Sequence, residues 1–192
     1  GESTIAAHSI AMQVTTVTFM LPLSVGLAAA VRTGNLLGAS NFKHARYSSF
    51  FAICVAVSLA VFNFFILYGY GSDLASLFNT DPSIISLSGS LLMVAAFMQI
   101  SDGVSFTGQG ALRGYKDTFI PMILLLISYW IFAMPIGYYL TNFGFGNPYG
   151  AKGMWYGMII GLTIFSFLSI FRLRWIMNSK IRKVLKQELL PL

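Results

Sequence analysis

Charged residues are scarce in this chain. Of its 192 residues only 9% are charged, 56% are hydrophobic, and the mean hydropathy is +0.74. A soluble domain carries about 25% charged residues. The scarcity excludes an ordinary soluble domain and predicts several spans in a lipid bilayer. The net charge of +6 comes from residues between and after the hydrophobic runs, as membrane topology requires, so we expect no nucleic-acid partner.

Cysteine, histidine and familiar catalytic motifs are also sparse or missing. The single cysteine, Cys54, permits no disulfide within the chain and no cysteine-based zinc site, and the two histidines are far apart. HExxH, GxGxxG and the phosphate-binding GxxxxGK pattern are absent. Enzymes that work inside membranes need facing acids, a histidine cluster or a metal set. With one acid in the hydrophobic interior, we expect no enzyme and no cofactor.

The hydrophobic runs predict five membrane-spanning helices in a single all-α polytopic membrane domain. Each run reaches the ~20 residues that a spanning helix needs. Their approximate ranges are 5–37, 47–70, 82–112, 118–140 and 149–175, followed by a basic tail over 176–192. Asp81 before Pro82 is typical of a helix start. Gly153, Gly157 and Gly161 recur every four residues and predict a face for close helix packing.

Asp102 is the most informative residue of the third run. It lies eleven residues before Arg113, or ~16 Å along a helix, which is near the midplane of a hydrocarbon core about 30 Å thick. Gln99, Asp102 and Ser105 share one stripe at helical spacing. Intramembrane carboxylates are costly and often mark ion or substrate pathways. The alternative is a polar ladder that only joins helices.

The first run adds polar candidates, because Gln13 and Thr16 share one helix face. The residues that we expect to line a polar cavity near the acid are Gln99, Ser105, Gln13 and Thr16. Pro22 in the first run and Pro135 in the fourth each remove a backbone hydrogen bond and predict kinks.

Basic residues predict the orientation. Five spans place eleven of the 12 Lys and Arg residues on one side of the membrane and only Lys152 on the other. The positive-inside rule makes the first side cytoplasmic, so we expect the N-terminus outside and the tail over 176–192 in the cytoplasm. An outside N-terminus without a signal sequence also suggests that at least one span precedes residue 1.

Two sets of residues together form a pattern that is specific enough to compare with a known family. The first is Ala6-Ala7-His8, then Phe19-Met20-Leu21-Pro22-Leu23-Ser24, Gly26, Ala29, Arg32, Gly34 and Leu37-Gly38. The second is Phe78, Asp81-Pro82, Gln99, Asp102, Gly110-Ala111-Leu112-Arg113-Gly114, Asp117-Thr118 and Pro121, continued by Ser128-Tyr129-Trp130, Pro135 and Gly137-Tyr138. These residues resemble the MATE (multidrug and toxic compound extrusion) family, in its NorM-type branch, and the resemblance covers nearly the whole chain.

The resemblance implies a fold and a function. Family members have twelve spans in two lobes, and this chain resembles helices eight to twelve, five of the six helices of the C-terminal lobe. The implied partners are the missing N-terminal lobe and first helix, the lipid bilayer and small organic cations. Asp102 matches the membrane acid of the tenth helix, part of the cation site, whereas the partner glutamate falls on the missing helix. A glutamine is usual where Ser105 stands.

The implied activity is part of a secondary antiporter in a bacterial inner membrane. Such a protein exports organic cations or drugs in exchange for sodium ions or protons. Asp102 is the implied coupling residue, and if the coupling ion is sodium, its carboxylate is the implied metal ligand. The alternative is a non-transporting membrane fragment of a truncated transporter gene.

The orientation can be tested with single cysteines at Ser72 and Ser179, in a background in which Cys54 is replaced by serine. An impermeant thiol reagent added to whole cells should label position 72 and spare position 179, because the basic residues place these positions on opposite sides. Equal labelling, or labelling at position 179 alone, would contradict the predicted orientation.

Overall fold

The computed structural model describes the backbone of residues 1–188 and the side chains of residues 1–179, and all regular secondary structure in that range is helical. The elements are α1 (Glu2–Gly38), α2 (Phe42–Ser76), α3 (Pro82–Gly114), α4 (Phe119–Ile127), the π-helix η1 (Ser128–Ala133), α5 (Met134–Asn142) and α6 (Ala151–Glu188). Among the described residues, five helical stretches are long and apolar enough to cross a membrane. The predicted class, an all-α polytopic membrane protein, is confirmed.

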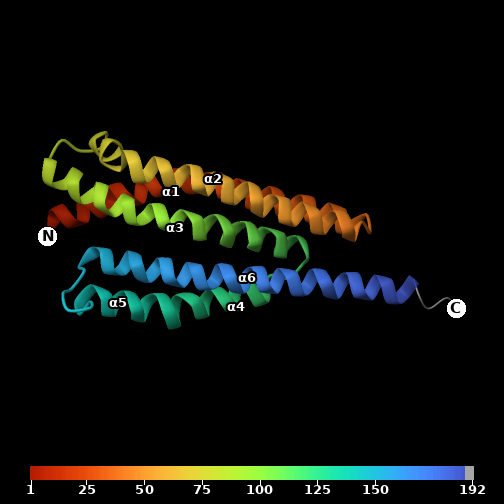
Figure 1. The fold of residues 1–192 in the computed structure, drawn as a ribbon. Helices are drawn as coiled ribbons and strands as arrows, with labels where there is room; N and C mark the ends of the chain where they lie inside the picture. The colour runs from red at the N-terminus through yellow and green to blue at the C-terminus, as the bar shows by residue number, and fades with distance from the viewer. Residues whose placement is uncertain (189–192) are drawn as a thin grey trace.

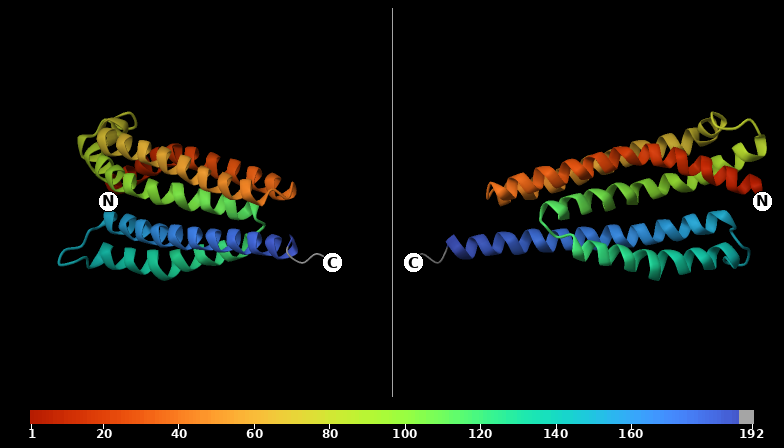
Figure 2. Two further views of the ribbon diagram at one scale, coloured as in Figure 1. Left: turned by 45° about the vertical axis from the view of Figure 1, so that its right-hand side comes forward. Right: turned by 180° about the vertical axis from the view of Figure 1, so that it is seen from behind.

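Helix α3 lies at the centre of the bundle. It packs against α1 and α2 on one side and against α6 on the other, and α6 in turn packs against the α4–η1–α5 stretch (Figures 1 and 2). The N-terminus and the far end of α6 lie at opposite ends of the bundle, as an odd number of crossings requires (Figure 1).

Glycines allow α3 to approach two neighbours at once. A Cβ added to Gly110 would lie 2.6 Å from the carbonyl carbon of Gly26 in α1, and one added to Gly103 would lie 3.1 Å from the carbonyl oxygen of Ala56 in α2. No side chain fits the first gap without moving a backbone. The backbones of α1 and α3 are therefore in direct contact at Gly26 and Gly110.

The start of α3 follows the sequence prediction. Asp81 Oδ1 accepts hydrogen bonds from the amide and the hydroxyl of Ser83, both at 2.8 Å, and Pro82 occupies the first turn. The Ser83 hydroxyl and amide lower the pKa of the Asp81 carboxyl below its ordinary value.

Two helices extend further than the predicted spans. Helix α2 continues past residue 70 to Ser76, with a break in helical geometry at Tyr70 (φ −116°, ψ 16°) between two glycines. Helix α6 continues past residue 175 to Glu188, so the predicted separate tail is a continuation of this helix as far as that residue. Hydropathy marks where a run leaves the hydrocarbon, but the backbone remains helical beyond that point. Residues 189–192 of the predicted tail lie outside the described part of the chain.

The two prolines have different effects. Helix α1 is unbroken through Pro22 and bends near its middle (Figure 2). Ahead of Pro135 the chain forms η1, whose wider turn relieves the clash that the proline ring would make with the preceding turn.

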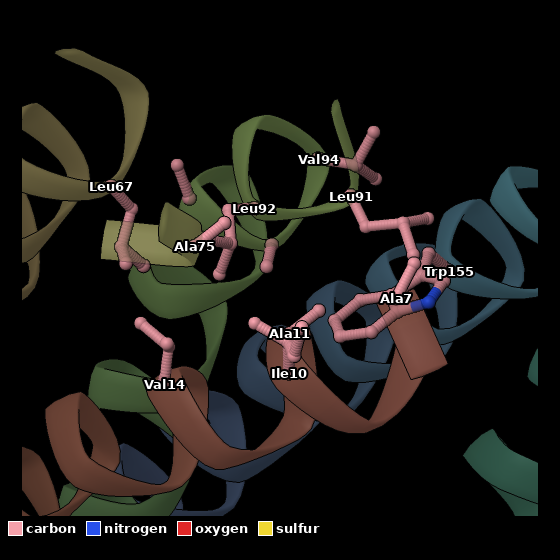
Figure 3. Packing of buried hydrophobic residues seen from close by; sticks show 12 residues of the cluster. Ala7, Ile10, Ala11, Val14, Leu67, Ala75, Leu91, Leu92, Val94 and Trp155 are labelled. Carbon is pink, nitrogen blue, oxygen red and sulfur yellow. The ribbon is translucent and has the colours of Figure 1, made fainter. Parts of the chain in front are cut away.

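Two apolar clusters lie on either side of the middle of α3. The first cluster consists of Ala7, Ile10, Ala11, Val14, Leu67, Ala75, Leu91, Leu92, Val94, Ala95, Ala96 and Trp155, and Figure 3 shows how these side chains lie between the helices. The second cluster consists of Ala111, Leu112, Tyr115, Leu173, Ile176 and Met177. The stretch of α3 between them carries Asp102 and most of its polar neighbours.

An ion pair joins the α3–α4 connection to α6. Arg172 Nε donates to Asp117 Oδ2 at 2.7 Å, and the Arg172 guanidinium lies 4.6 Å from the ring centroid of Trp175. This pair holds the end of α3 against α6 at the edge of the apolar region.

The close packing of α6 can be tested at Gly157. A Cβ there would lie 2.6 Å from the carbonyl oxygen of Ala133, so Gly157→Leu should push α6 away from η1 and α5. We expect a melting temperature in detergent that is lower by roughly 5 °C or more, as overpacking predicts.

Gly69→Leu is the matched control, because a Cβ on Gly69 meets no atom within 4 Å. It should melt within about 2 °C of the unaltered chain, since surface changes cost little. Equal melting of both variants would show that Gly157 makes no close contact.

Candidate functional site

Asp102 is buried in the middle of α3, with 6% of its surface exposed. Within residues 1–179, no hydrogen bond or ion pair satisfies its carboxylate, and the ion pair found there joins Arg172 to Asp117. A buried carboxylate without a partner is costly unless a proton, a cation or a polar ligand neutralises it.

A cavity of about 250 Å³ lies beside Asp102. Helix α1 contributes Met12, Thr15, Thr16 and Phe19, α3 contributes Met98, Asp102 and Phe106, and the remaining lining residues are Tyr129, Met158 and Leu162. Four elements, α1, α3, η1 and α6, therefore meet at one carboxylate. The phenyl rings of Phe19 and Phe106 pack edge to face with centroids 4.5 Å apart and form one wall.

The lining chemistry suits a cation. It combines one carboxylate with threonine and tyrosine hydroxyls, aromatic rings and three methionines. Aromatic faces attract cations, and methionine thioethers adapt to irregular apolar ligands. Thr16 Oγ1 donates to the Met12 carbonyl at 2.7 Å, which leaves its oxygen lone pairs available to a bound ion or donor. The site can therefore hold a small metal cation or part of an organic cation.

Of the four residues expected to line a cavity near the acid, one lines the cavity found in the structure. Thr16 lies on the cavity, whereas Gln13 is exposed and lies outside it. The reason is helical spacing: the cavity face of α1 runs through positions 12, 15, 16 and 19, which leaves position 13 on the adjoining face. The functional roles of both residues stay predictions.

Gln99 is fully buried where α1, α2 and α3 meet. Its Nε2 donates to Thr18 Oγ1, and Asn63 Nδ2 of α2 donates to the carbonyl of Thr18 at 2.9 Å. Gln99 Oε1 has no hydrogen-bond partner among the described residues. Gln99 therefore joins helices one turn from Asp102 and does not line the cavity.

Ser105 is fully buried between α3 and α6 and also lies outside the cavity. Its Oγ lies 2.7 Å from Ser166 Oγ, and Ser166 Oγ donates to the Ser101 carbonyl at 2.9 Å. Ser101 Oγ lies 2.8 Å from Thr163 Oγ1. These hydroxyls form the kind of polar ladder that joins helices in a membrane.

Tyr129 is the residue that sequence reasoning missed. It comes from η1, and a π-helix often occurs at functional sites. The nearby Pro135 indicated an irregular turn, but the sequence did not show that this turn would place a phenol beside Asp102.

Comparisons with known proteins identify the family. The family model MatE matches residues 1–139. The chain is 36% identical over 179 residues to a probable multidrug resistance protein NorM of Oceanobacillus iheyensis, covering 93% of this chain and 39% of the relative. It is 39% identical over 190 residues to a NorM of Idiomarina loihiensis, covering 98% and 41%, respectively. The chain thus spans about two fifths of the length of these curated relatives.

Solved structures agree on the fold. The eukaryotic MATE transporter AtDTX14 is similar over 95% of this chain and 41% of its own, with a TM-score of 0.83 and 22% identity. An outward-facing multidrug resistance MATE family transporter of the MOP superfamily gives a TM-score of 0.85 at 17% identity, over 95% of this chain and 40% of its own. The resemblance found in the sequence is confirmed, and the chain belongs to the MatE family.

Proposed function

We propose that this chain is part of a secondary active antiporter that exports organic cations or drugs in exchange for sodium ions or protons. The observation that carries the proposal is the buried Asp102 carboxylate, which has no partner among the described residues and faces a cavity with aromatic walls. The names of the relatives, multidrug resistance protein NorM and PmpM, support export of drugs. No catalytic step is proposed.

One carboxylate serves two cations in turn. A proton or sodium ion neutralises Asp102 in one conformation, and an organic cation occupies the cavity in another. The exchange requires only that the two conformations bind the coupling ion with different affinities. The rings of Phe19 and Phe106 and the oxygen of Thr16 then provide contacts to the cation.

Other segments complete the transporter in this proposal. The curated relatives are more than twice as long as the matched region, which is consistent with a second lobe and a further helix outside these residues. We place the whole in a bacterial inner membrane, with the N-terminus of this chain outside and its C-terminal end in the cytoplasm. A non-transporting membrane fragment is the alternative, and the assay below separates the two.

Asp102→Asn should abolish coupling and preserve the fold, because asparagine keeps the shape and loses the charge. In proteoliposomes with an imposed sodium or proton gradient, we expect a two-lobe transporter that contains this chain to lose roughly tenfold or more of its gradient-driven export. The melting temperature should stay close to that of the unaltered protein.

Asp73→Asn is the matched control, since Asp73 is exposed near the end of α2 and lies outside the cavity. It should export at the unaltered rate. Near-normal export against a gradient by Asp102→Asn would make Asp102 a structural residue only. An unaltered two-lobe protein that exports nothing under either gradient would favour the non-transporting alternative.

Thr16 and Gln13 provide a second test of the site. Thr16→Val removes an oxygen that lines the cavity and should weaken the apparent affinity for an organic cation by about fivefold, the effect of ~1 kcal/mol. Gln13→Leu changes a side chain outside the cavity and should leave the affinity unchanged. The opposite result would assign the functional face of α1 to Gln13.

A further inference from the structure

A second and larger hollow lies between α1 and α2, away from Asp102. Its volume is about 560 Å³, within the range of small-molecule sites. None of its lining residues lines the Asp102 cavity, and none of them is acidic. We call it the α1–α2 groove.

The groove is polar at one end and apolar at the other. Arg32, His44, Tyr47 and Ser48 line the half next to the turn between the two helices. Val25, Phe51 and Val55 line the half that extends toward the middle of the bundle. Polarity therefore falls from the membrane surface toward the hydrocarbon, as it does along a phospholipid molecule.

The length of the groove also matches one leaflet. Its lining on α1 runs from Val25 to Leu36, eleven residues or ~16 Å at ~1.5 Å per residue. Half of a hydrocarbon core is about 15 Å. An acyl chain lying along α1 would thus reach the end of the groove near the bilayer midplane.

The charges at the polar end suit an anion. Arg32 is exposed and has no ion-pair partner within residues 1–179. His44 Nδ1 donates to Asn41 Oδ1 at 2.7 Å, which orients the ring, and in a protonated ring Nε2–H is left as a donor for an anion. Lys43 precedes His44 in the sequence at the start of α2 and does not line the groove. Basic pockets between helices on the cytoplasmic side are typical sites for anionic lipid headgroups.

We propose that the α1–α2 groove binds an anionic phospholipid of the cytoplasmic leaflet. The phosphate lies at the Arg32 guanidinium and the protonated ring of His44, and one acyl chain follows Phe51 and Val55 toward the midplane. The proposal depends on the orientation that places this end of the bundle in the cytoplasm, and it is independent of the transport role of Asp102.

Lipid binding can be measured on the full chain in a neutral detergent by native mass spectrometry, with phosphatidylglycerol and phosphatidylcholine of identical acyl chains. We expect phosphatidylglycerol to bind more tightly. Arg32→Gln should weaken its apparent affinity by about fivefold, the effect of one lost surface cation near an anionic lipid. Ala28→Phe places a ring in the groove and should weaken binding while keeping the charge.

Arg174→Gln is the matched control, because Arg174 is an exposed arginine on α6 outside the groove, and it should bind as the unaltered chain does. Equal binding of the two lipids, or equal losses in Arg32→Gln and Arg174→Gln, would overturn the proposal. So would glycerol phosphate binding as well as the whole lipid.

The measurement is repeated on a two-lobe transporter that contains these residues. We expect the same preference and the same loss in Arg32→Gln. If the chain alone binds the lipid and the longer protein does not, protein covers the groove and the proposal is wrong. Loss of transport in Asp102→Asn has no bearing on this result, so the two proposals fail separately.

Discussion

Direct backbone contact between α1 and α3 is the constraint on which the rest of the bundle depends. At Gly26 and Gly110 no side chain separates the two helices. This contact brings Phe19 against Phe106 and places Thr16 of α1 at the same cavity as Asp102. Bulkier residues at the crossing would separate the helices and open the cavity to lipid. Two glycines without side chains, Gly26 and Gly110, therefore determine how closely α1 approaches the acid on α3.

Burial and polarity are arranged in layers along α3. Apolar clusters occupy both ends, and the layer between them holds Gln99, Asp102 and Ser105. Gln99 Nε2 and Ser105 Oγ form hydrogen bonds to neighbouring helices, whereas the Asp102 carboxylate forms none among the described residues. The same stripe thus contains two residues that join helices and one acid without a partner among the described residues. The polar-ladder interpretation fits Gln99 and Ser105, and the coupling role of Asp102 is a proposal.

Local chemistry explains what could be predicted from the sequence. Hydropathy identified the five helices among the described residues, the Asp81–Pro82 pair marked the start of α3, and the hydrophobic pattern put Asp102 in the interior of that helix. A cavity beside the acid was expected, but most of its lining could not be predicted, because four elements from distant parts of the chain form it. Tyr129 depends on the register of a π-helix, and the exclusion of Gln13 depends on which face of α1 meets α3. Helix register and helix orientation depend on how the helices pack against one another, which cannot be read from a single sequence.

The length of α6 has a consequence for how the protein sits in the bilayer. Its 38 residues extend ~57 Å, nearly twice the ~30 Å of the hydrocarbon core, so length alone does not fix the depth of the helix. Arg172 and Trp175 are of the residue types that anchor helices at a membrane interface, and Arg172 is paired with Asp117 in the α3–α4 connection. Helix α6 therefore cannot slide along its axis without taking α3 with it. A thinner or thicker bilayer would then be accommodated by tilting of the linked helices or by deformation of the lipid around them, and tilting would move the helices around Asp102 together.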